Sequence, residues 1–398
     1  MKNYLAELEK LNPWWESGFV AEDVYPRPTY TRSLLNHPHN LIDVLIGARR
    51  VGKTFILKEC IYQLLESHSP DTILYITAEL PILAKVSLVD VLSWFRKKQK
   101  KQEKAFVFID EIQELSEWQT VLKYYVDTDT IKFFVTGSSS LVLNQHTAKL
   151  TGRCLTTTVF PLNYTEFLSF KSKSTGYLWS AGIETFTQYL ETGGYPNYVL
   201  TNHAQLLIET VDSILYRDLL SLYGIRNPAL LKTILQLLCD KITTPLSSTT
   251  IAKDLKIDPQ TAASYLKYLQ DVYLVYPLYR KGRSHRIVKG STPKFYLNDS
   301  GVLKLFSQTS RIGHLAENAV FLHLLQASSR TTSGVYYDIE DDMEIDFVMK
   351  DYRYDVKFKP IENPKPDICY LVNVVSPDVD AKQMPLWKFL WDVPLHQR

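Results

Sequence analysis

The residues of this chain whose types and spacing could do chemistry begin with the stretch Gly-Ala-Arg-Arg-Val-Gly-Lys-Thr at 47–54. An apolar run over 41–46 precedes it and an amphipathic run over 55–65 follows it. The two glycines permit a tight turn whose backbone N–H groups converge on an anion at the start of a helix. Lys53 can reach the β- and γ-phosphates of a nucleotide, and the Thr54 hydroxyl can bind Mg²⁺. The stretch predicts a phosphate-binding loop for ATP, made of Gly47, Ala48, Arg49, Arg50, Val51, Gly52, Lys53, Thr54 and Phe55.

An acidic pair, Asp110-Glu111, directly follows the apolar run 106–109. Ligands of open parallel sheets bind at the carboxyl ends of the strands. We expect Asp110 to hold the shell of the Mg²⁺ ion through water and Glu111 to orient and activate the attacking water. The alternative is a solvated acidic turn.

A second set of charged residues lies near the C-terminus and comprises Glu317, Asp346, Asp355 and Lys357. On a strand, Asp355 and Lys357 point to the same face. The Asp355 carboxylate can then share a Mg²⁺ ion with Asp346, while the Lys357 ammonium stabilises the attacking water or the pentavalent phosphate, and Glu317 completes the acidic cluster. The alternative is a charged edge strand without catalysis.

Alternating strands and helices must position the first two motifs. Apolar stretches predict strands at 41–46, 72–78, 105–109, 131–135 and 156–160, and helices at 55–65, 87–98 and 114–126. Such alternation implies a parallel sheet covered by helices on both faces.

Residues 229–298 carry a different pattern. A short helix over 248–255 is followed by a turn and by a second helix that Asp258 caps and Pro259 begins. A strand over 273–279, a basic segment over 280–286 and a returning strand over 294–297 complete a winged helix-turn-helix. Its predicted DNA contacts are Thr261, Ser264, Lys267, Arg280, Lys281, Arg283 and Arg286. Many winged helices bind proteins instead, and that alternative stays open.

The phosphate loop, the acidic pair and the segment Thr136–Ser140 together resemble the AAA-type ATPases. More narrowly, the chain resembles a prokaryotic group in which such an ATPase precedes a poorly characterised C-terminal region. The further stretches that carry this resemblance are Asn12–Trp15, Ile109–Gln113, Gly152-Arg153, Gly193–Pro196 and Tyr216–Leu220.

The resemblance implies roles for two more residues. The strand before Thr136–Ser140 would lie between the phosphate-loop strand and the Asp110 strand, so that Ser138 or a neighbouring hydroxyl would sense the γ-phosphate. Arg153 would act in trans as an arginine finger, which implies self-association; a surface arginine is the alternative. The implied catalytic set is Lys53, Asp110, Glu111, Ser138 and Arg153.

The C-terminal region resembles a restriction-endonuclease-like core with the PD-(D/E)xK pattern. The group's usual Glu-x-Lys appears here as Asp355-Val356-Lys357, one methylene shorter. Many domains of this fold have lost cleavage while they keep their shape, so cutting and mere holding of DNA both remain open.

Composition limits the partners. The net charge of +2 over 398 residues gives no global field, so any basic surface must be local. The basic run 96–104 is a candidate for such a surface. It either contacts nucleic-acid phosphates or forms a solvated loop. Four cysteines far apart, without a C-x-x-C pair, make a disulfide frame or zinc site unexpected. Because no apolar run approaches a membrane span, we expect a cytoplasmic protein without a membrane partner.

The predicted fold class is α/β. The first part is an N-terminal approach segment (1–35), which packs beside the nucleotide base or straps the core. A P-loop parallel-sheet AAA-type ATPase core (36–165) and a helical lid (166–228) follow it. The last two parts are the winged helix-turn-helix (229–298) and a restriction-endonuclease-like α/β domain (299–398). The predicted function is Mg²⁺-dependent ATP hydrolysis coupled to DNA binding. The alternatives are an ATP-dependent regulatory or scaffold switch that binds protein, and an ATP-gated metal-dependent DNase.

Overall fold

The computed structural model describes the whole chain except residues 1, 23, 81–85, 100–103, 138–149, 226, 283–290, 329–333, 341–342, 358, 362–364, 366, 373–382 and 393–398. Its contacts divide the chain into two compact units. The first comprises Met1–Ala48 and Gly52–Val159, and the second comprises Arg49–Val51 and Phe160–Arg398.

The first unit is built on a five-stranded sheet in the order β2-β3-β4-β1-β5. All neighbouring strands are parallel, so the parallel sheet predicted from the sequence is confirmed. β4 lies between β1 and β3, as the resemblance implied. The strands are β1 (Ile42–Ile46), β2 (Ile73–Thr77), β3 (Ala105–Asp110), β4 (Ile131–Gly137) and β5 (Cys154–Thr158).

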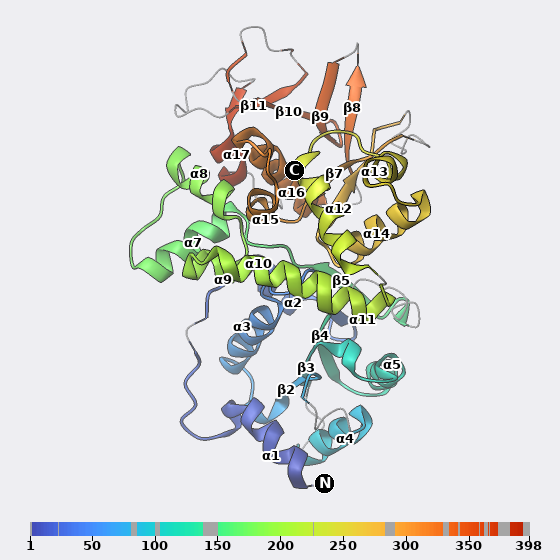
Figure 1. Ribbon diagram of the computed structural model, residues 1–398. Helices are drawn as coiled ribbons and strands as arrows, with labels where there is room; N and C mark the ends of the chain where they lie inside the picture. The colour runs from blue at the N-terminus through green and yellow to red at the C-terminus, as the bar shows by residue number, and fades with distance from the viewer. Residues whose placement is uncertain are drawn as a thin grey trace. The chain divides into compact units, whose positions relative to one another are not determined.

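Helices cover this sheet on both sides, as Figure 1 shows. α2 (Pro28–Asn36) packs on α3 (Lys53–Leu65), and α4 (Leu88–Lys98) packs on α5 (Trp118–Thr128). The expected helix over 114–126 begins later than predicted, at Trp118. Residues Ile112–Glu114 form a separate 3₁₀ turn, and Glu117 takes a left-handed φ of 51° that an α-helix cannot include.

The N-terminal segment, α1 (Lys2–Leu11) and the 3₁₀ turn Pro13–Trp15, covers the edge strand β2. The Asn12 side chain imitates a neighbouring strand, since its Nδ2 donates to the Tyr75 carbonyl (2.9 Å) and its Oδ1 accepts from the Tyr75 N–H (2.6 Å). The indoles of Trp14 and Trp15 donate to the Ile73 carbonyl at 3.2 and 3.0 Å. The segment is therefore a strap that satisfies an exposed sheet edge.

A buried ion pair fastens the entry to β1. The Lys132 ammonium lies 2.7 Å from Asp43 and also donates to the carbonyls of Pro38 and Leu41. His37 contacts the other Asp43 oxygen at 2.6 Å. Burial lowers the pKa of Lys132, and the Asp43 charge opposes that effect. Because Lys132 belongs to β4, the pair ties the segment before β1 to the neighbouring strand.

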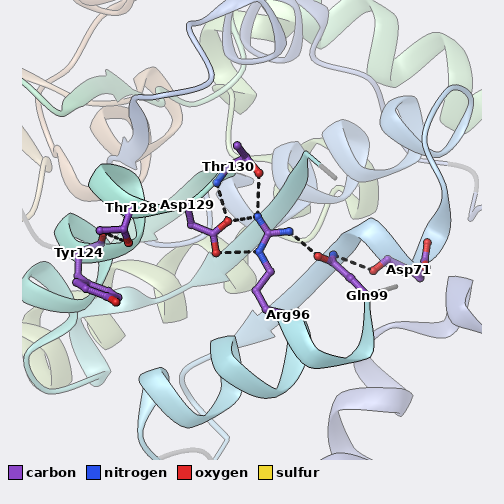
Figure 2. A network of polar contacts seen from close by, with 7 residues as sticks. All are labelled: Asp71, Arg96, Gln99, Tyr124, Thr128, Asp129 and Thr130. Carbon is purple, nitrogen blue, oxygen red and sulfur yellow. Dashed lines mark hydrogen bonds and ion pairs between the residues drawn. The ribbon is translucent and has the colours of Figure 1, made fainter. Parts of the chain in front are cut away.

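The first residue of the basic run, Arg96, is part of a polar network (Figure 2). Its guanidinium grips the Asp129 carboxylate with two nitrogens and donates to Gln99 and Thr130 at 2.5 and 3.1 Å. Lys98 lies 3.9 Å from the centre of the Trp15 ring. These two cations hold the first unit together, which disfavours a role for them in gripping nucleic acid; residues 100–103 of the run lie outside the described residues.

The second unit begins with helices that follow one another closely along the chain. They are α7 (Tyr164–Thr175), α8 (Ile183–Thr192), α9 (Pro196–Thr201), α10 (Ala204–Ser213), a π-helical turn (Ile214–Asp218), α11 (Leu219–Tyr223) and α12 (Pro228–Asp240).

The Gly193-Gly194 turn between α8 and α9 explains one of the stretches that carried the resemblance. A Cβ on Gly193 would lie 2.1 Å from Asp299, and one on Gly194 would lie 2.1 Å from the Leu162 carbonyl. Asp299 instead accepts the Gly194 N–H at 2.6 Å, and Asn298 donates to the Tyr195 hydroxyl at 2.8 Å. The motif therefore packs closely against the residues at the start of α15 (Ser300–Phe306) and is hydrogen-bonded to them.

The region of the predicted winged helix contains α13 (Ser248–Leu255), α14 (Pro259–Asp271) and the antiparallel pair β6 (Val275–Leu278) and β7 (Lys294–Leu297). Asp258 caps α14 by accepting from the Gln260 N–H at 2.8 Å. Tyr268, which the helical pattern places on the outer face, is not free there, since its ring stacks on Tyr223 at 3.8 Å.

The C-terminal region has a mixed sheet in the order β12-β11-β10-β9-β8. Strands β8 to β10 are antiparallel and β10 to β12 parallel. The elements are α16 (Ile312–Ser328), β8 (Val335–Glu340), β9 (Met343–Met349), β10 (Tyr352–Lys357), β11 (Cys369–Val372), β12 (Gln383–Pro385) and α17 (Leu386–Asp392). Among the helices of the described ranges, none is long and apolar enough to cross a bilayer.

Candidate functional site

The loop between β1 and α3 needs glycine at both ends. Gly47 has a φ of 143°, and a Cβ there would lie 2.2 Å from the Val159 carbonyl oxygen. Gly52 precedes the first residue of α3 with a φ of 100°, in the left-handed region. The loop therefore turns sharply and brings the first N–H groups of α3 toward one point, which is the geometry that binds an anion.

The side chains of the loop converge on β3. The buried Lys53 ammonium donates to the carbonyls of Gly47 and Ala48 at 3.0 and 2.9 Å. The Thr54 hydroxyl donates to Asp110 Oδ2 at 2.6 Å. A hydroxyl and a carboxylate are oxygen donors that Mg²⁺ prefers, so these two residues fit the predicted metal. Phe55 is 57% exposed.

The middle of the loop, Arg49–Val51, belongs to the second unit. Arg49 donates to Asp218 at 2.7 Å, and Arg50, whose φ is 62°, donates to the Thr210 hydroxyl at 3.4 Å. Val51 is fully buried. The place of these three residues in the loop was predicted from the sequence, but their side-chain partners were not.

Asp110 and Glu111 are held by residues for which the sequence predicted no such role. Asp110 accepts from the Tyr75 hydroxyl at 3.2 Å and from the Thr136 hydroxyl. Thr136 in turn accepts the Glu111 N–H at 3.0 Å. Burial and the Asp110 charge raise the pKa of Tyr75, which keeps its proton for this bond.

Glu111 stands in the left-handed region, with φ 53° and ψ 50°. This conformation costs a residue with a Cβ about 1–2 kcal/mol. The bond from its N–H to Thr136 and a bond of 2.5 Å from Gln113 Nε2 to its carboxylate fix it there. The pair therefore leaves the strand with one carboxylate toward Thr54 and the other turned toward Gln113.

The other two residues of the predicted catalytic set are Ser138 and Arg153. Ser138 lies outside the described residues. Arg153 forms an ion pair of 2.7 Å with Asp127, with the two side chains 36% and 40% exposed. The hydrogen bond from Arg153 lowers the pKa of Asp127. Arg153 is thus on the surface, as either prediction for it requires.

Among the predicted DNA contacts that the structure describes, the side chains of Arg280, Lys267 and Ser264 have partners within the second unit. Arg280 donates to the Ile339 carbonyl at 3.1 Å, and the Lys281 N–H donates to the Tyr337 carbonyl at 2.7 Å. Lys267 pairs with Asp271 at 2.7 Å, although its side chain is 64% exposed. Ser264 donates to the Gln260 carbonyl, Thr261 is partly buried, and Arg283 and Arg286 fall outside the described residues.

The C-terminal charged residues come together between α16, β9 and β10. Glu317 accepts from the Tyr296 hydroxyl at 2.8 Å, and Asp346 accepts from the Val356 N–H at 2.9 Å. The Lys357 ammonium lies 2.9 Å from Asp355 Oδ2, while Asp355 Oδ1 is buried without a hydrogen-bond partner among the described atoms. Tyr296 comes from β7, and no sequence signal connected it with this cluster.

Burial and mutual repulsion perturb these carboxyls. Burial raises the pKa of Glu317 to about 7, against the attraction of Lys294. Burial, Glu317 and Asp355 raise the pKa of Asp346 well above its usual value. Asp346 and Asp355 are neighbouring carboxyls, and such a pair needs either a shared proton or a bound cation. No group of three or more His, Cys, Asp or Glu in the described part of the chain is already placed to hold a metal ion.

Family comparisons fit the geometry of the first unit. Residues 39–168 match the family described as "AAA domain". These residues form an AAA-type P-loop domain. Residues 183–311 match a domain of unknown function, and this range runs from α8 to α15 and includes β6 and β7.

Two relatives extend over most of the chain. An uncharacterized protein of Methanocaldococcus jannaschii is 29% identical over 325 residues, which is 78% of this chain and 72% of that protein. An uncharacterized protein of Haemophilus influenzae is 26% identical over 354 residues, 83% of this chain and 85% of that protein.

Solved structures give weaker similarity. The Holliday junction branch migration motor RuvB of Thermotoga maritima superposes with a TM-score of 0.33 at 14% identity, covering 65% of this chain and 88% of that chain. AMPPCP-bound DnaA of Aquifex aeolicus superposes with a TM-score of 0.32 at 14% identity, covering 63% and 89%. Similarity at this level gives no guide to what the present chain binds.

Proposed function

We propose that the AAA domain binds and hydrolyses ATP with Mg²⁺. The observation that carries the proposal is the 2.6 Å contact between the Thr54 hydroxyl and Asp110, at the edge of the sheet where Lys53 and Glu111 also lie. A phosphate loop followed by a helix supplies N–H donors for the phosphates, and the acidic strand end supplies groups for metal and water.

Each residue has a distinct task. When ATP binds, the Lys53 ammonium donates to phosphate oxygens instead of the Gly47 and Ala48 carbonyls. Its charge then neutralises that of the phosphates. Thr54 and Asp110 hold the Mg²⁺ ion, which polarises the phosphate when bound. Glu111 orients the attacking water and accepts its proton. The Arg153 guanidinium, once released from Asp127, is free to neutralise phosphate charge on a neighbouring chain.

Two substitutions test the ATP site. Lys53→Ala should lose nucleotide binding, because the carbonyls of the loop would then face the phosphates without a cation. Glu111→Gln should bind ATP with Mg²⁺ normally but hydrolyse it about 10²-fold or more slowly. Binding of a fluorescent ATP analogue and release of phosphate are the measurements. Normal turnover by Glu111→Gln would remove Glu111 from the role of water activator.

The finer part of the proposal is that hydrolysis is coupled to DNA through the α13–α14 region. It is supported by the helix-turn-helix spacing and by the basic segment after β6. Steady-state hydrolysis with duplex, single-stranded and branched DNA separates this from the regulatory switch, since a switch that binds protein gives no reason for DNA to accelerate turnover. Hydrolysis indifferent to every DNA form would favour the protein-binding alternative.

A second candidate activity is metal-dependent cleavage of phosphodiesters by Glu317, Asp346, Asp355 and Lys357. The buried, unpartnered Asp355 Oδ1 beside Lys357 favours it, because that oxygen gains a partner when a cation binds. Asp346→Ala should abolish DNA cutting with Mg²⁺ or Mn²⁺ while ATP hydrolysis persists. Cutting that survives in Asp346→Ala would exclude this cluster as its source.

A further inference from the structure

A pocket on the first unit lies at the far end of α3 from the phosphate loop. It has a volume of about 480 Å³ and is formed by the segment after α1, by the last turn of α3 and by Pro70 before β2. Since α3 runs from Lys53 to Leu65, its two ends are roughly 20 Å apart. The pocket is therefore distinct from the proposed ATP site.

Three aromatic side chains line the pocket. Trp14 and Phe19 meet edge to face with their ring centres 6.2 Å apart, and Phe19 lies 6.0 Å from Tyr62. Trp14 is fixed by its bond to the Ile73 carbonyl, whereas Phe19 and Tyr62 are only half-buried. Aromatic faces arranged in this way attract a cation through the ring quadrupole.

The polar groups around the pocket are mainly acidic. Glu16 and Glu66 line it, both are exposed, and neither has an ion-pair partner among the described residues. Glu22 stands nearby and raises the pKa of Tyr62 together with burial, and Lys58 pairs with Glu22 at 3.6 Å. Two carboxylates thus remain available beside the aromatic rings. A nucleotide or another phosphate would be repelled there.

The neighbouring surface already holds a cation by the same chemistry. Lys98 lies 3.9 Å from the centre of the Trp15 ring and 5.5 Å from that of Trp94. The Trp15 ring, next to Trp14 in the sequence, thus already has a cation on its face.

We propose that this pocket binds an arginine side chain within a basic segment of a partner protein. A guanidinium stacks flat on Trp14, Phe19 or Tyr62 while its N–H fork donates to Glu16 and Glu66. The volume is in the range of small-ligand sites, so the pocket has room for residues that flank the arginine. This inference is independent of the ATP site.

Fluorine NMR on the full chain labelled with 5-fluorotryptophan tests the proposal. The probe is acetyl-Gly-Arg-Gly-amide, and its neutral counterpart carries citrulline in place of arginine. The Trp14 signal is assigned from Trp14→Phe, and the buried Trp118 serves as an internal reference. The arginine peptide should shift the Trp14 signal saturably, and the citrulline peptide should not.

Variants separate charge recognition from packing. The double substitution Glu16→Gln and Glu66→Gln should weaken binding of the arginine peptide by at least about fivefold. It should leave ATP binding unchanged. Glu9→Gln with Glu184→Gln, two exposed glutamates elsewhere, changes the net charge equally and should have no effect. Equal shifts by the citrulline peptide, an unaffected pocket variant, or no saturable Trp14 shift would each overturn the proposal.

Discussion

At the scale of single residues, a hydroxyl and an amide hold the two acids of the proposed ATP centre in place. Thr136 joins Asp110 to the N–H of Glu111, and Gln113 holds the Glu111 carboxylate. Thr136 lies at the start of the segment in which a γ-phosphate sensor was expected. Its hydroxyl is bonded to the acidic pair, so we expect any sensing of the γ-phosphate to use another group.

Gln113 is a positioning residue. Gln113→Leu should lower kcat for ATP about tenfold or less while KM for ATP changes little, because the amide orients Glu111 and does not contact phosphate. Glu114→Gln, an exposed neighbour, is the matched control and should behave as the wild type. Steady-state phosphate release over a range of ATP concentrations gives both constants. A rise in KM alone would mean that Gln113 contributes to nucleotide binding instead.

The residue contacts also show where prediction from sequence stops. The loop was predictable because its glycines, lysine and threonine lie within one stretch, 47–54, and the Asp110-Glu111 pair follows a recognisable apolar strand. Tyr75 and Thr136 come from the two strands that flank β3, and Tyr296 reaches Glu317 from β7. Bonds of this kind depend on strand order and rotamers, for which a single sequence carries no periodic signal.

At the scale of elements, Arg96 joins the end of α4 to the end of α5 and the start of β4 through Asp129 and Thr130. Its side chain is only 14% exposed. The basic composition of the run 96–104 predicted either a nucleic-acid surface or a solvated loop. Arg96 fits neither prediction, because its side chain is bonded to other residues of the first unit. The acid that pairs with it lies 33 residues away, beyond the reach of local pattern.

Arg96→Lys should lower the free energy of unfolding by about 1–2 kcal/mol, since an ammonium cannot grip both Asp129 oxygens and reach Gln99 and Thr130. Lys97→Ala, at an exposed position on the same helix, should change it by less than about 0.5 kcal/mol. Urea unfolding followed by circular dichroism measures both. Equal stability of Arg96→Lys and the wild type would show that the fork adds nothing beyond its charge.

At the scale of the whole molecule, burial of acids makes stability depend on pH. The pKa values of Asp299 and Glu317 are raised to about 7, and that of Asp346 is raised as well. These three carboxyls therefore bind more protons in the folded chain than in the unfolded chain between about pH 4 and 7, whereas His323, whose pKa burial lowers to about 4, offsets part of that difference. The stabilisation is fully present below the unfolded pKa values and is lost as pH rises through about 7. The pKa of Asp240 is lowered, so this residue changes the stability only below this pH window.

The melting temperature without added metal should fall by roughly 2–6 °C from pH 5 to pH 8. Glu317→Gln should flatten that dependence, because a neutral amide replaces the carboxyl that loses its proton. If a divalent cation binds the cluster, Mn²⁺ should raise the melting temperature of the wild type at pH 8 more than that of Glu317→Gln. A melting temperature that rises steadily over this range would contradict the raised pKa values.

The Asn12 contact with β2 has a consequence for how the protein can be handled. The Asn12 amide and the indoles of Trp14 and Trp15 occupy the place where a further strand would pair, so side chains rather than a strand stop the growth of the sheet. A shortened version that starts after Trp15 would keep every residue of the ATP centre and yet present an open β-edge to its own copies. Such a version would be expected to self-assemble through its sheets, and a catalytic fragment cut at the limits of the AAA match, residues 39–168, would need that edge covered to stay in solution.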